Sequence, residues 1–373
     1  MTSDGGSEGG SQGDDAGSGL PAISLYSCGG MLDGVAYTVG ATIGSQQFQL
    51  SVDTGSTTLG VASTSCTSCM VKPEYSADST AVDEKMTGES MYGMGSWSGE
   101  IYQDTVSLPP SASTPLKFVA IDTQSNFFET IPCDSTLGGM QGIIGFAPAA
   151  ALVTGTTAFM DQLAATQKVP NVFSTKLCDT GGTLWLGGYD PSATTAAPQY
   201  TPFAAEFFDA GYYAVNLVSI AVNGTTVPVA SAEYADSLVD TGTSVFLVGT
   251  TAYNALTTAI AGNAAFTKIF GGASFFSGQS CATTSETKAT LDSTLPALTL
   301  TFGSNPAMTV QATATESYLF PRDGGWCPAM QGVDQGQDFP IAAVMGAPVL
   351  RSNVLVFDEG QKRLGFAPHT ACP

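Results

Sequence analysis

The sequence predicts an almost all-β protein of two related lobes with a few short helices, and three observations support this fold class. From residue 20 onward, short runs rich in Val, Ile, Tyr, Phe and Thr recur between Gly, Pro, Ser and Asn, which is the pattern of strands joined by turns. A segment reading QLSVDTGST at 49–57 returns as DSLVDTGTS at 236–244. The length of 373 residues corresponds to two or three domains of about 150 residues.

The expected elements can be placed in order along the chain. Strands are predicted at 35–39, 47–52, 118–121, 184–186, 213–222, 297–302 and 354–357. Helical periodicity is restricted to 157–166 and 250–261. A repeat this long indicates two lobes flanking a cleft, and not a solenoid of short units.

The lobe boundary is expected near the Pro-, Ala- and Thr-rich segment at 190–199. This gives an N-terminal lobe at 20–195 and a C-terminal lobe at 196–373. Residues 1–19 contain seven Gly, four Ser and four acidic residues, a composition typical of a flexible linker. We expect this segment to be disordered, and it would also suit a tether behind a lipid-bearing residue.

Charge and histidine content exclude several classes of function. Lys plus Arg number 11 and Asp plus Glu 32, a formal charge of −21, which argues against nucleic acid and against a polybasic membrane patch. The single histidine, His369, lies near the C-terminus. A Ser-His-Asp hydrolase or a histidine-based zinc site is therefore not expected, and neither a metal nor a cofactor is predicted. Any catalytic reaction must therefore be carried out by carboxylate, hydroxyl or thiol groups.

The eight cysteines are even in number and mostly far apart, which favours disulfides and an oxidising compartment. A secreted, periplasmic or cell-envelope protein is expected. Cys66 and Cys69 could be read as a redox motif or as half of a zinc site, but no second paired-Cys motif exists, so a small structural bridge is favoured. Asn223 begins a glycosylation sequon, which has meaning only in a eukaryotic secretory route.

The repeated Asp-Thr-Gly carries the predicted chemistry. One copy fits an ordinary turn, whereas two copies, each after an apolar strand, place Asp53 and Asp240 at a common interface. The glycine of each copy allows close backbone approach and its N–H can bond the carboxylate, while the next hydroxyl can bond the outer oxygen. The residues in these orienting positions are Gly55 and Ser56 in the first copy and Gly242 and Thr243 in the second.

Two carboxyl groups about 3 Å apart cannot both ionise, so they share one proton. One then acts as an acid and the other as a base, and between them they can activate a water molecule. That is what amide hydrolysis requires when neither histidine nor metal is present.

On these motifs the chain resembles the pepsin-like aspartic proteases, whose carboxyl pair is the standard example of a shared proton. The resemblance covers residues 22–373 and includes MYGMGSWSG at 91–99, like the family's flap hairpin, GIIGFA at 142–147, the strand at 213–222, and VMGAPVLRSNVLVFDEGQKRLGFAPHTAC at 344–372. It implies a monomeric endopeptidase with an acid pH optimum that binds extended peptides and pepstatin-like inhibitors.

The same resemblance assigns roles. Asp240 would be ionised and take a proton from water, and Asp53 would be protonated and donate to the carbonyl oxygen. A hydrophobic preference at P1 and P1′ is expected, and the implied substrate-binding residues are Tyr92, Gly93, Ser51, Ile143 and Leu238.

Cysteine placement resembles the β-secretase branch of the family. It implies the pair Cys178–Cys372, the common second-lobe bridge Cys281–Cys327 and a shortened loop bridge Cys66–Cys69. Cys28 and Cys133 remain as the fourth pair.

The chain departs from the family pattern in three places. The family usually has Trp seven residues after the first Asp, where this chain has Gly60, and Trp97 in the flap strand could restore rigidity. Ser51 replaces an apolar residue of the S1 pocket. No basic residue precedes Lys72, so the family's basic prosegment was either removed or never part of this branch, and the protein should be active without processing. The alternative function is a non-catalytic, peptide- or polysaccharide-binding member of the same fold.

Overall fold

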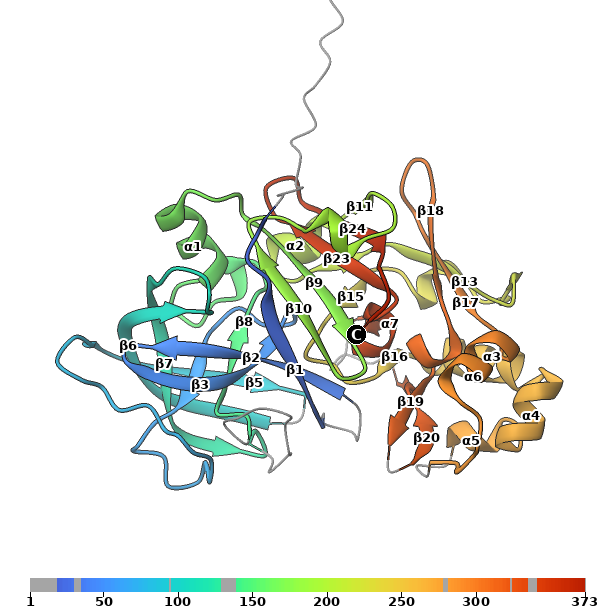
Figure 1. Cartoon of the computed structure of the whole chain (residues 1–373), viewed down its shortest axis with the longest axis horizontal. Coiled ribbons are helices and arrows are strands. Elements are labelled where there is room, and N and C mark those ends of the chain that lie inside the picture. Colours follow the sequence, from blue (N-terminus) through green and yellow to red (C-terminus); the bar gives the residue numbers. More distant parts are fainter. Residues whose placement is uncertain are drawn as a thin grey trace, which may run out of the picture.

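The computed structural model shows strands arranged in two groups, with a central set of strands between them (Figure 1). The all-β, two-lobed prediction is confirmed. The division of the chain at residues 195 and 196 stays a prediction, and the predicted linker lies outside the described residues apart from Gly19. The structure describes residues 19–29, 35–93, 95–128, 139–277, 281–322, 324–334 and 341–372.

The largest sheet combines the strands β1 to β11 with the last two strands, β23 and β24. Their order is β11-β24-β23-β9-β10-β1-β2-β3-β8-β4-β7-β6-β5. The bounds are β1 Ile23–Gly29, β2 Val35–Ile43, β3 Gln46–Asp53, β4 Gly60–Ala62, β5 Val82–Tyr92, β6 Gly95–Ser107, β7 Thr114–Ser125, β8 Gly142–Gly145, β9 Val172–Cys178, β10 Gly181–Leu186, β11 Gln199–Pro202, β23 Asn353–Asp358 and β24 Arg363–Pro368.

The second half of the chain forms smaller sheets. One has the order β12-β15-β22-β16-β21, a second β14-β13-β17-β18, and a third pairs β19 with β20. The bounds are β12 Ala214–Val215, β13 Leu217–Val222, β14 Thr225–Thr226, β15 Ser237–Val239, β16 Phe246–Gly249, β17 Leu298–Phe302, β18 Met308–Ala312, β19 Leu319–Arg322, β20 Gly325–Pro328, β21 Met330–Val333 and β22 Ala343–Met345.

Both predicted helices are present, and further short ones accompany them. The helices are α1 Phe159–Gln167, α2 Ala205–Asp209, α3 Thr250–Ala261, α4 Ala264–Phe270, α5 Ser274–Ser277, α6 Lys288–Thr294 and α7 Ala347–Leu350, with 3₁₀ turns η2 Ala149–Ala151, η3 Pro191–Ala193, η4 Ser231–Glu233 and η5 Ala314–Glu316. The strand expected at 213–222 is two strands, because β12 pairs with β15 while β13 pairs with β17 in another sheet. None of the described helices is long and apolar enough to cross a membrane.

The sequence repeat is also a structural repeat. β3 pairs in parallel with β8, and β15 pairs in parallel with β22. An antiparallel neighbour then joins each pair, β4 beside β8 and β16 beside β22. Each aspartate of the repeat therefore stands at the end of the same small arrangement of strands.

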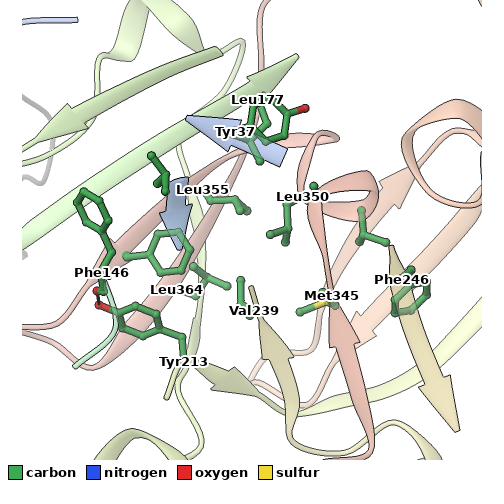
Figure 2. Close-up of a cluster of buried hydrophobic side chains, with 14 of the residues drawn as sticks. Tyr37, Phe146, Leu177, Tyr213, Val239, Phe246, Met345, Leu350, Leu355 and Leu364 are labelled. Carbon is green, nitrogen blue, oxygen red and sulfur yellow. Dashed lines mark hydrogen bonds between the residues drawn. The ribbon is translucent and has the colours of Figure 1, made fainter. Parts of the chain in front are cut away.

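A continuous hydrophobic core joins the two halves. Phe173 of β9 stacks on Phe357 of β23, with ring centroids 4.5 Å apart. Tyr213 from the second half packs against both rings and lies beside Phe146 of the first half (Figure 2). The halves are thus held by shared packing as well as by the central strands.

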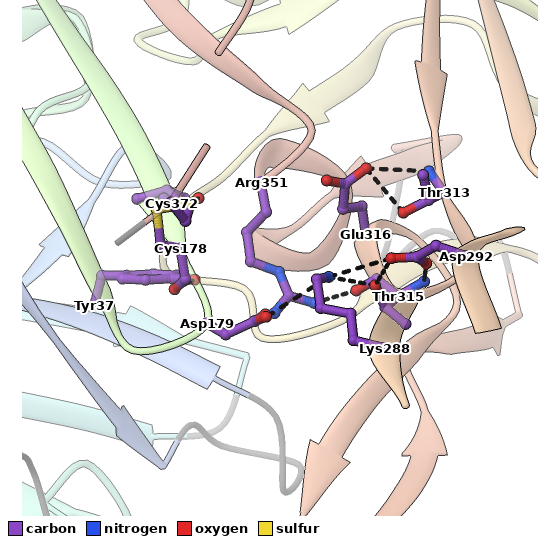
Figure 3. A network of polar contacts seen from close by, with 11 residues as sticks. Tyr37, Cys178, Asp179, Lys288, Asp292, Thr313, Thr315, Glu316, Arg351 and Cys372 are labelled. Atoms are coloured by element: carbon purple, nitrogen blue, oxygen red, sulfur yellow. Dashed lines mark hydrogen bonds and ion pairs between the residues drawn. A yellow bond between two sulfur atoms is a disulfide. The ribbon is translucent and has the colours of Figure 1, made fainter. Parts of the chain in front are cut away.

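The described residues form disulfides between Cys66 and Cys69, Cys178 and Cys372, and Cys281 and Cys327. The partner predicted for Cys28 is Cys133, which lies outside the described residues. The Cys178–Cys372 bridge ties the end of β9 to the C-terminal segment. Beside it, Arg351 Nη1 lies 2.5 Å from Asp179 Oδ1, and this ion pair continues into a network with α6 and η5 (Figure 3).

Candidate active site

The two repeated loops meet face to face, with each glycine beside the opposite aspartate. A Cβ atom on Gly55 would lie 2.7 Å from Asp240 Cγ, and one on Gly242 would lie 2.5 Å from Asp53 Oδ1. No side chain fits at such distances, so glycine is required at both positions for the loops to approach. The structure therefore brings together the two aspartates that the sequence singled out.

Each carboxylate is held by its own loop in the same way. Gly55 N–H donates to Asp53 Oδ1 at 2.8 Å and Ser56 Oγ–H donates to Asp53 Oδ2 at 2.5 Å. In the second loop the corresponding bonds go to Asp240, from Gly242 N–H at 2.7 Å and from Thr243 Oγ1–H at 2.5 Å. In both loops Oδ1 accepts from a backbone N–H and Oδ2 accepts from a side-chain hydroxyl.

The two loops are also cross-linked by the threonines between Asp and Gly. Thr241 N–H donates to Thr54 Oγ1 at 2.9 Å, and Thr54 N–H donates to Thr241 Oγ1 at 3.1 Å. The hydroxyls then donate across the interface to Val239 O and Val52 O. Sequence reasoning missed these two residues, although threonine occupies the middle position of both copies of the repeat.

The two carboxyl groups differ in their surroundings. Asp53 is only 5% exposed, while Asp240 is more accessible. Burial raises the pKa of Asp53 well above its ordinary value, and the charge and hydrogen bonding of Asp240 act in the same direction. Such a carboxyl holds its proton at a pH where an exposed carboxyl has lost it.

Tyr92 lies at the end of β5, on the hairpin that β5 forms with β6. Its ring lies 5.2 Å from Phe127 and 6.2 Å from Trp97, measured between centroids. Burial raises the pKa of Tyr92 to about 12, and the next contribution is the negative charge of Asp53. Tyr92 is therefore close enough to Asp53 for the charge of that carboxylate to raise the pKa of the tyrosine hydroxyl. The neighbouring Gly93 is exposed.

Trp97 occupies the space over Gly60. A Cβ atom on Gly60 would lie 3.2 Å from Trp97 Cζ2 and 3.2 Å from Ile121 Cδ1. Trp97 itself is buried, at 2% exposure, in a cluster that includes Phe127 and Ile143. The small residue at position 60 is thus matched by a large one from the neighbouring hairpin.

The hydrophobic residues expected to line subsites, Ile143 and Leu238, lie in two separate clusters. Ile143 belongs to the cluster under the hairpin, and it pairs across the parallel ladder with Ser51, which is buried. Leu238 lies in a separate cluster with Ala214 and Val344. Among the described residues, no group of three or more His, Cys, Asp or Glu side chains could hold a metal ion.

Comparison with known proteins extends over the whole arrangement. A family model described as eukaryotic aspartyl protease matches residues 36–369. An aspartic protease of Phaffia rhodozyma is 29% identical over 333 residues, which is 87% of this chain and 74% of the relative. Pepsin A of Sus scrofa is 27% identical over 341 residues, 89% of this chain and 80% of the relative.

A beta-secretase of Strongylocentrotus purpuratus is 26% identical over 378 residues, covering 91% of this chain and 67% of the relative. Each of these alignments is long enough to include both copies of the repeat.

Proposed function

This chain belongs to the eukaryotic aspartyl protease family and is an aspartic endopeptidase, and on that premise we propose that Asp53 and Asp240 form its catalytic pair. The observation that supports this most directly is the placement of each loop glycine against the opposite carboxyl group. A water molecule held between the two carboxyls is in reach of both. Its attack on a peptide carbonyl then needs one acid and one base.

In the proposed mechanism Asp240 is ionised and takes a proton from the attacking water. Asp53 is protonated and donates to the carbonyl oxygen as the tetrahedral intermediate forms. Asp240, now protonated, next donates its proton to the amide nitrogen, a hydroxyl of the intermediate returns a proton to Asp53, and the C–N bond breaks. The raised pKa of the buried Asp53 supports this assignment, which describes one microstate of a coupled pair.

Several residues would position the reacting groups. Gly55, Ser56, Gly242 and Thr243 orient the carboxylates through the bonds described above. Tyr92 closes over the substrate on its hairpin, and Gly93 beside it leaves room for the peptide backbone. Hairpin closure of this kind excludes water and aligns the substrate.

Trp97 would fix the orientation of Tyr92 in place of a bulky residue at position 60. Its ring covers Gly60 and lies against Tyr92. Substrate specificity would come from Ser51 and Ile143 on one side of the scissile bond and Leu238 on the other, with hydrophobic side chains preferred at P1 and P1′.

The proposed substrate is an extended peptide or protein, cleaved by a monomer. The disulfides fit a secreted or extracellular protein, and attachment through residues 1–19 is part of the proposal. Turnover of a fluorogenic peptide between pH 3 and 7, with and without pepstatin, tests the function. Cleavage in acid that pepstatin abolishes is expected. Peptide binding without cleavage at any pH would instead favour the non-catalytic alternative.

A further inference from the structure

Glu359 is a partly buried carboxyl group that the proposed mechanism does not use. It follows the last residue of β23, at the turn into β24. Its Oε1 accepts a short hydrogen bond from the hydroxyl of Tyr213, and its Oε2 accepts from Asn171 Nδ2 at 2.9 Å. Three segments that are far apart in the sequence therefore meet at this one side chain.

The hydroxyl of Tyr213 has two acceptors and one proton. Besides Glu359 Oε1, it lies 2.8 Å from the backbone oxygen of Phe146 (Figure 2). A phenol can donate only once, so with an ionised Glu359 one of the two contacts places oxygen against oxygen without a hydrogen between them. With a protonated Glu359 both contacts are satisfied, because the carboxyl donates to Tyr213 and Tyr213 donates to Phe146.

We propose that Glu359 keeps its carboxyl proton in the active protein and is a positioning residue that links the two halves behind the aspartate pair. When the pH rises, this proton leaves to solvent and Tyr213 turns its own proton from Phe146 to the carboxylate. The inference rests on the proposed function, because it makes this proton one of the factors that limit activity at neutral pH.

A second carboxylate stands close by and disfavours ionisation of Glu359. Asn171 Nδ2 donates to Asp161 Oδ1 at 2.7 Å as well as to Glu359, so one amide group bridges both carboxyls. Burial raises the pKa of Glu359 to about 7, and the charge of Asp161 acts in the same direction, against the hydrogen bonds from Tyr213 and Asn171. The carboxyl group of Glu359 therefore titrates near neutral pH.

The nearby cations on the same hairpin are engaged elsewhere. Lys362 Nζ lies 2.9 Å from Asp209 Oδ1, and Arg363 Nε lies 2.7 Å from Asp358 Oδ2. Within the described part of the chain, no cation forms an ion pair with Glu359. An ionised Glu359 would have only hydrogen bonds to offset its burial.

The link reaches both aspartates through backbone. Phe146 N–H donates to the carbonyl oxygen of Asp53 at 2.8 Å, and Val239, the residue before Asp240, donates its N–H to Tyr213 O at 2.8 Å. The bond from Tyr213 to Phe146 thus joins the strand ends that carry the two carboxyl groups. Its loss would loosen their relative placement.

The sign of the effect follows from the proton count. A carboxyl whose pKa is higher in the fold, about 7, than its ordinary 4.5 stabilises the fold below the lower value. That contribution is lost as the pH rises through the higher value. Glu359→Gln replaces the protonated carboxyl by an amide that donates to Tyr213 and accepts from Asn171 at every pH.

The test is thermal unfolding of the full chain from pH 4 to pH 8, together with the pH profile of kcat/KM. We expect Glu359→Gln to melt like the wild type at pH 4, and at pH 7 to melt higher by roughly 5 °C. The upper limb of its cleavage profile should move toward neutral pH by about half a unit to one unit. Glu206→Gln, an exposed carboxyl on α2, is the matched control and should change neither curve.

Two further measurements keep the outcome decisive. Glu359→Ala should melt below the wild type at pH 4, since both hydrogen bonds are lost, so that Gln restores what Ala removes. Infrared difference spectra between pH 5 and pH 8 should show a protonated carboxyl band in the wild type that is absent from Glu359→Gln. Identical unfolding curves for wild type and Glu359→Gln across this range, or an unchanged infrared band, would overturn the inference. Unfolding needs no substrate, so this result stands apart from any failure of the protease assay.

Discussion

The first and second Asp-Thr-Gly loops have the same internal hydrogen bonds but different surroundings. In both, a glycine N–H and a side-chain hydroxyl hold the carboxylate at nearly equal distances. Yet Asp53 is almost fully buried near Tyr92, while Asp240 is more accessible. The repeated motif therefore holds the two carboxyls in the same way, and the greater burial of Asp53 is the main reason why its pKa is raised well above the ordinary value.

The largest effect is expected from removing either carboxylate. Asp53→Asn and Asp240→Asn should each lower kcat by about a hundredfold to ten-thousandfold, because a pair that shares one proton needs both carboxyl groups. Asn keeps the shape, so the melting temperature in acid should change little. Steady-state cleavage with Glu206→Gln as the control measures this. Substantial cleavage by either variant would refute the assignment of the pair.

The second-largest effect is expected in the pH dependence of peptide cleavage, because the carboxyl groups of the two loops differ in burial. In the proposed mechanism activity requires a protonated Asp53, whose pKa is raised by burial first and by Asp240 second, so cleavage should fall as the pH rises past that raised value. It should also fall in strong acid, where the pair gains a second proton. An optimum above about pH 7.5 would contradict the mechanism.

Carbon NMR of labelled aspartate in Asp240→Asn sharpens the same point. The pKa of Asp53 should fall when the neighbouring charge is removed, yet stay above the ordinary 3.8 because burial remains. If the pKa of Asp53 returned fully to the ordinary value, burial would make no contribution to the raised pKa.

The crossed threonines test whether the loops are equivalent. Thr54→Ala and Thr241→Ala each leave a buried N–H and a buried carbonyl without a partner, which costs about 1–3 kcal/mol per unsatisfied group. Denaturant unfolding should show similar losses for the two variants, and serine should restore most of each loss by keeping the hydroxyl. A loss confined to one of the two would mean that the cross-link is unequal.

A smaller effect is expected at one position where the two copies of the repeat differ. Two residues before the aspartates stand Ser51 and Leu238. Ser51→Ile makes the first position apolar like the second, and it should sharpen the preference for hydrophobic P1 side chains by roughly tenfold. Cleavage-site profiling on a peptide library measures the change. An unaltered P1 profile would place residue 51 away from the pocket.

The smallest effect is expected at the contact between Gly60 and Trp97. In Gly60→Ala the added Cβ meets Trp97 and Ile121 at 3.2 Å, so the indole must shift by a few tenths of an ångström. Overpacking of this size costs about 1 kcal/mol, and a few-fold rise in KM is expected if the shift reaches Tyr92. An unchanged KM together with normal cleavage by Trp97→Phe would separate this cluster from the hairpin's function.

The sequence predicts the parts of the site that depend on local chemistry. The apolar strand before Asp53, the glycine two residues later and the hydroxyl after it have a physical role within one loop, and the second copy repeats it. Both predicted helices exist for the same reason, since their periodicity is local. The short helix α4 was not predicted, because its few residues show too little periodicity to distinguish a helix from a loop. Its N-cap residue is Asn263.

Contacts between distant segments could not be predicted in this way. The exchange between Thr54 and Thr241 depends on how one loop faces the other. The hydrogen bond from Tyr213 to Glu359 joins residues 146 positions apart. The match of Trp97 with Gly60 required the hairpin to be folded over β4. The partners of Thr54, Thr241, Tyr213 and Glu359 were not visible in the sequence, whereas Trp97 could be suggested as a compensation for Gly60 without the direct contact between them.

The strand order of the largest sheet has a consequence for how the protein is made. β23 and β24 lie between β9 and β11, so a growing chain exposes the open edge of β9 until residues 353–368 have left the ribosome. Unpaired edges of this kind attract other chains, and pairing across such a sequence distance is slow. A folding helper that shields β9 during synthesis would raise the yield of active protein, and nonsense truncation before residue 353 would release chains prone to aggregate.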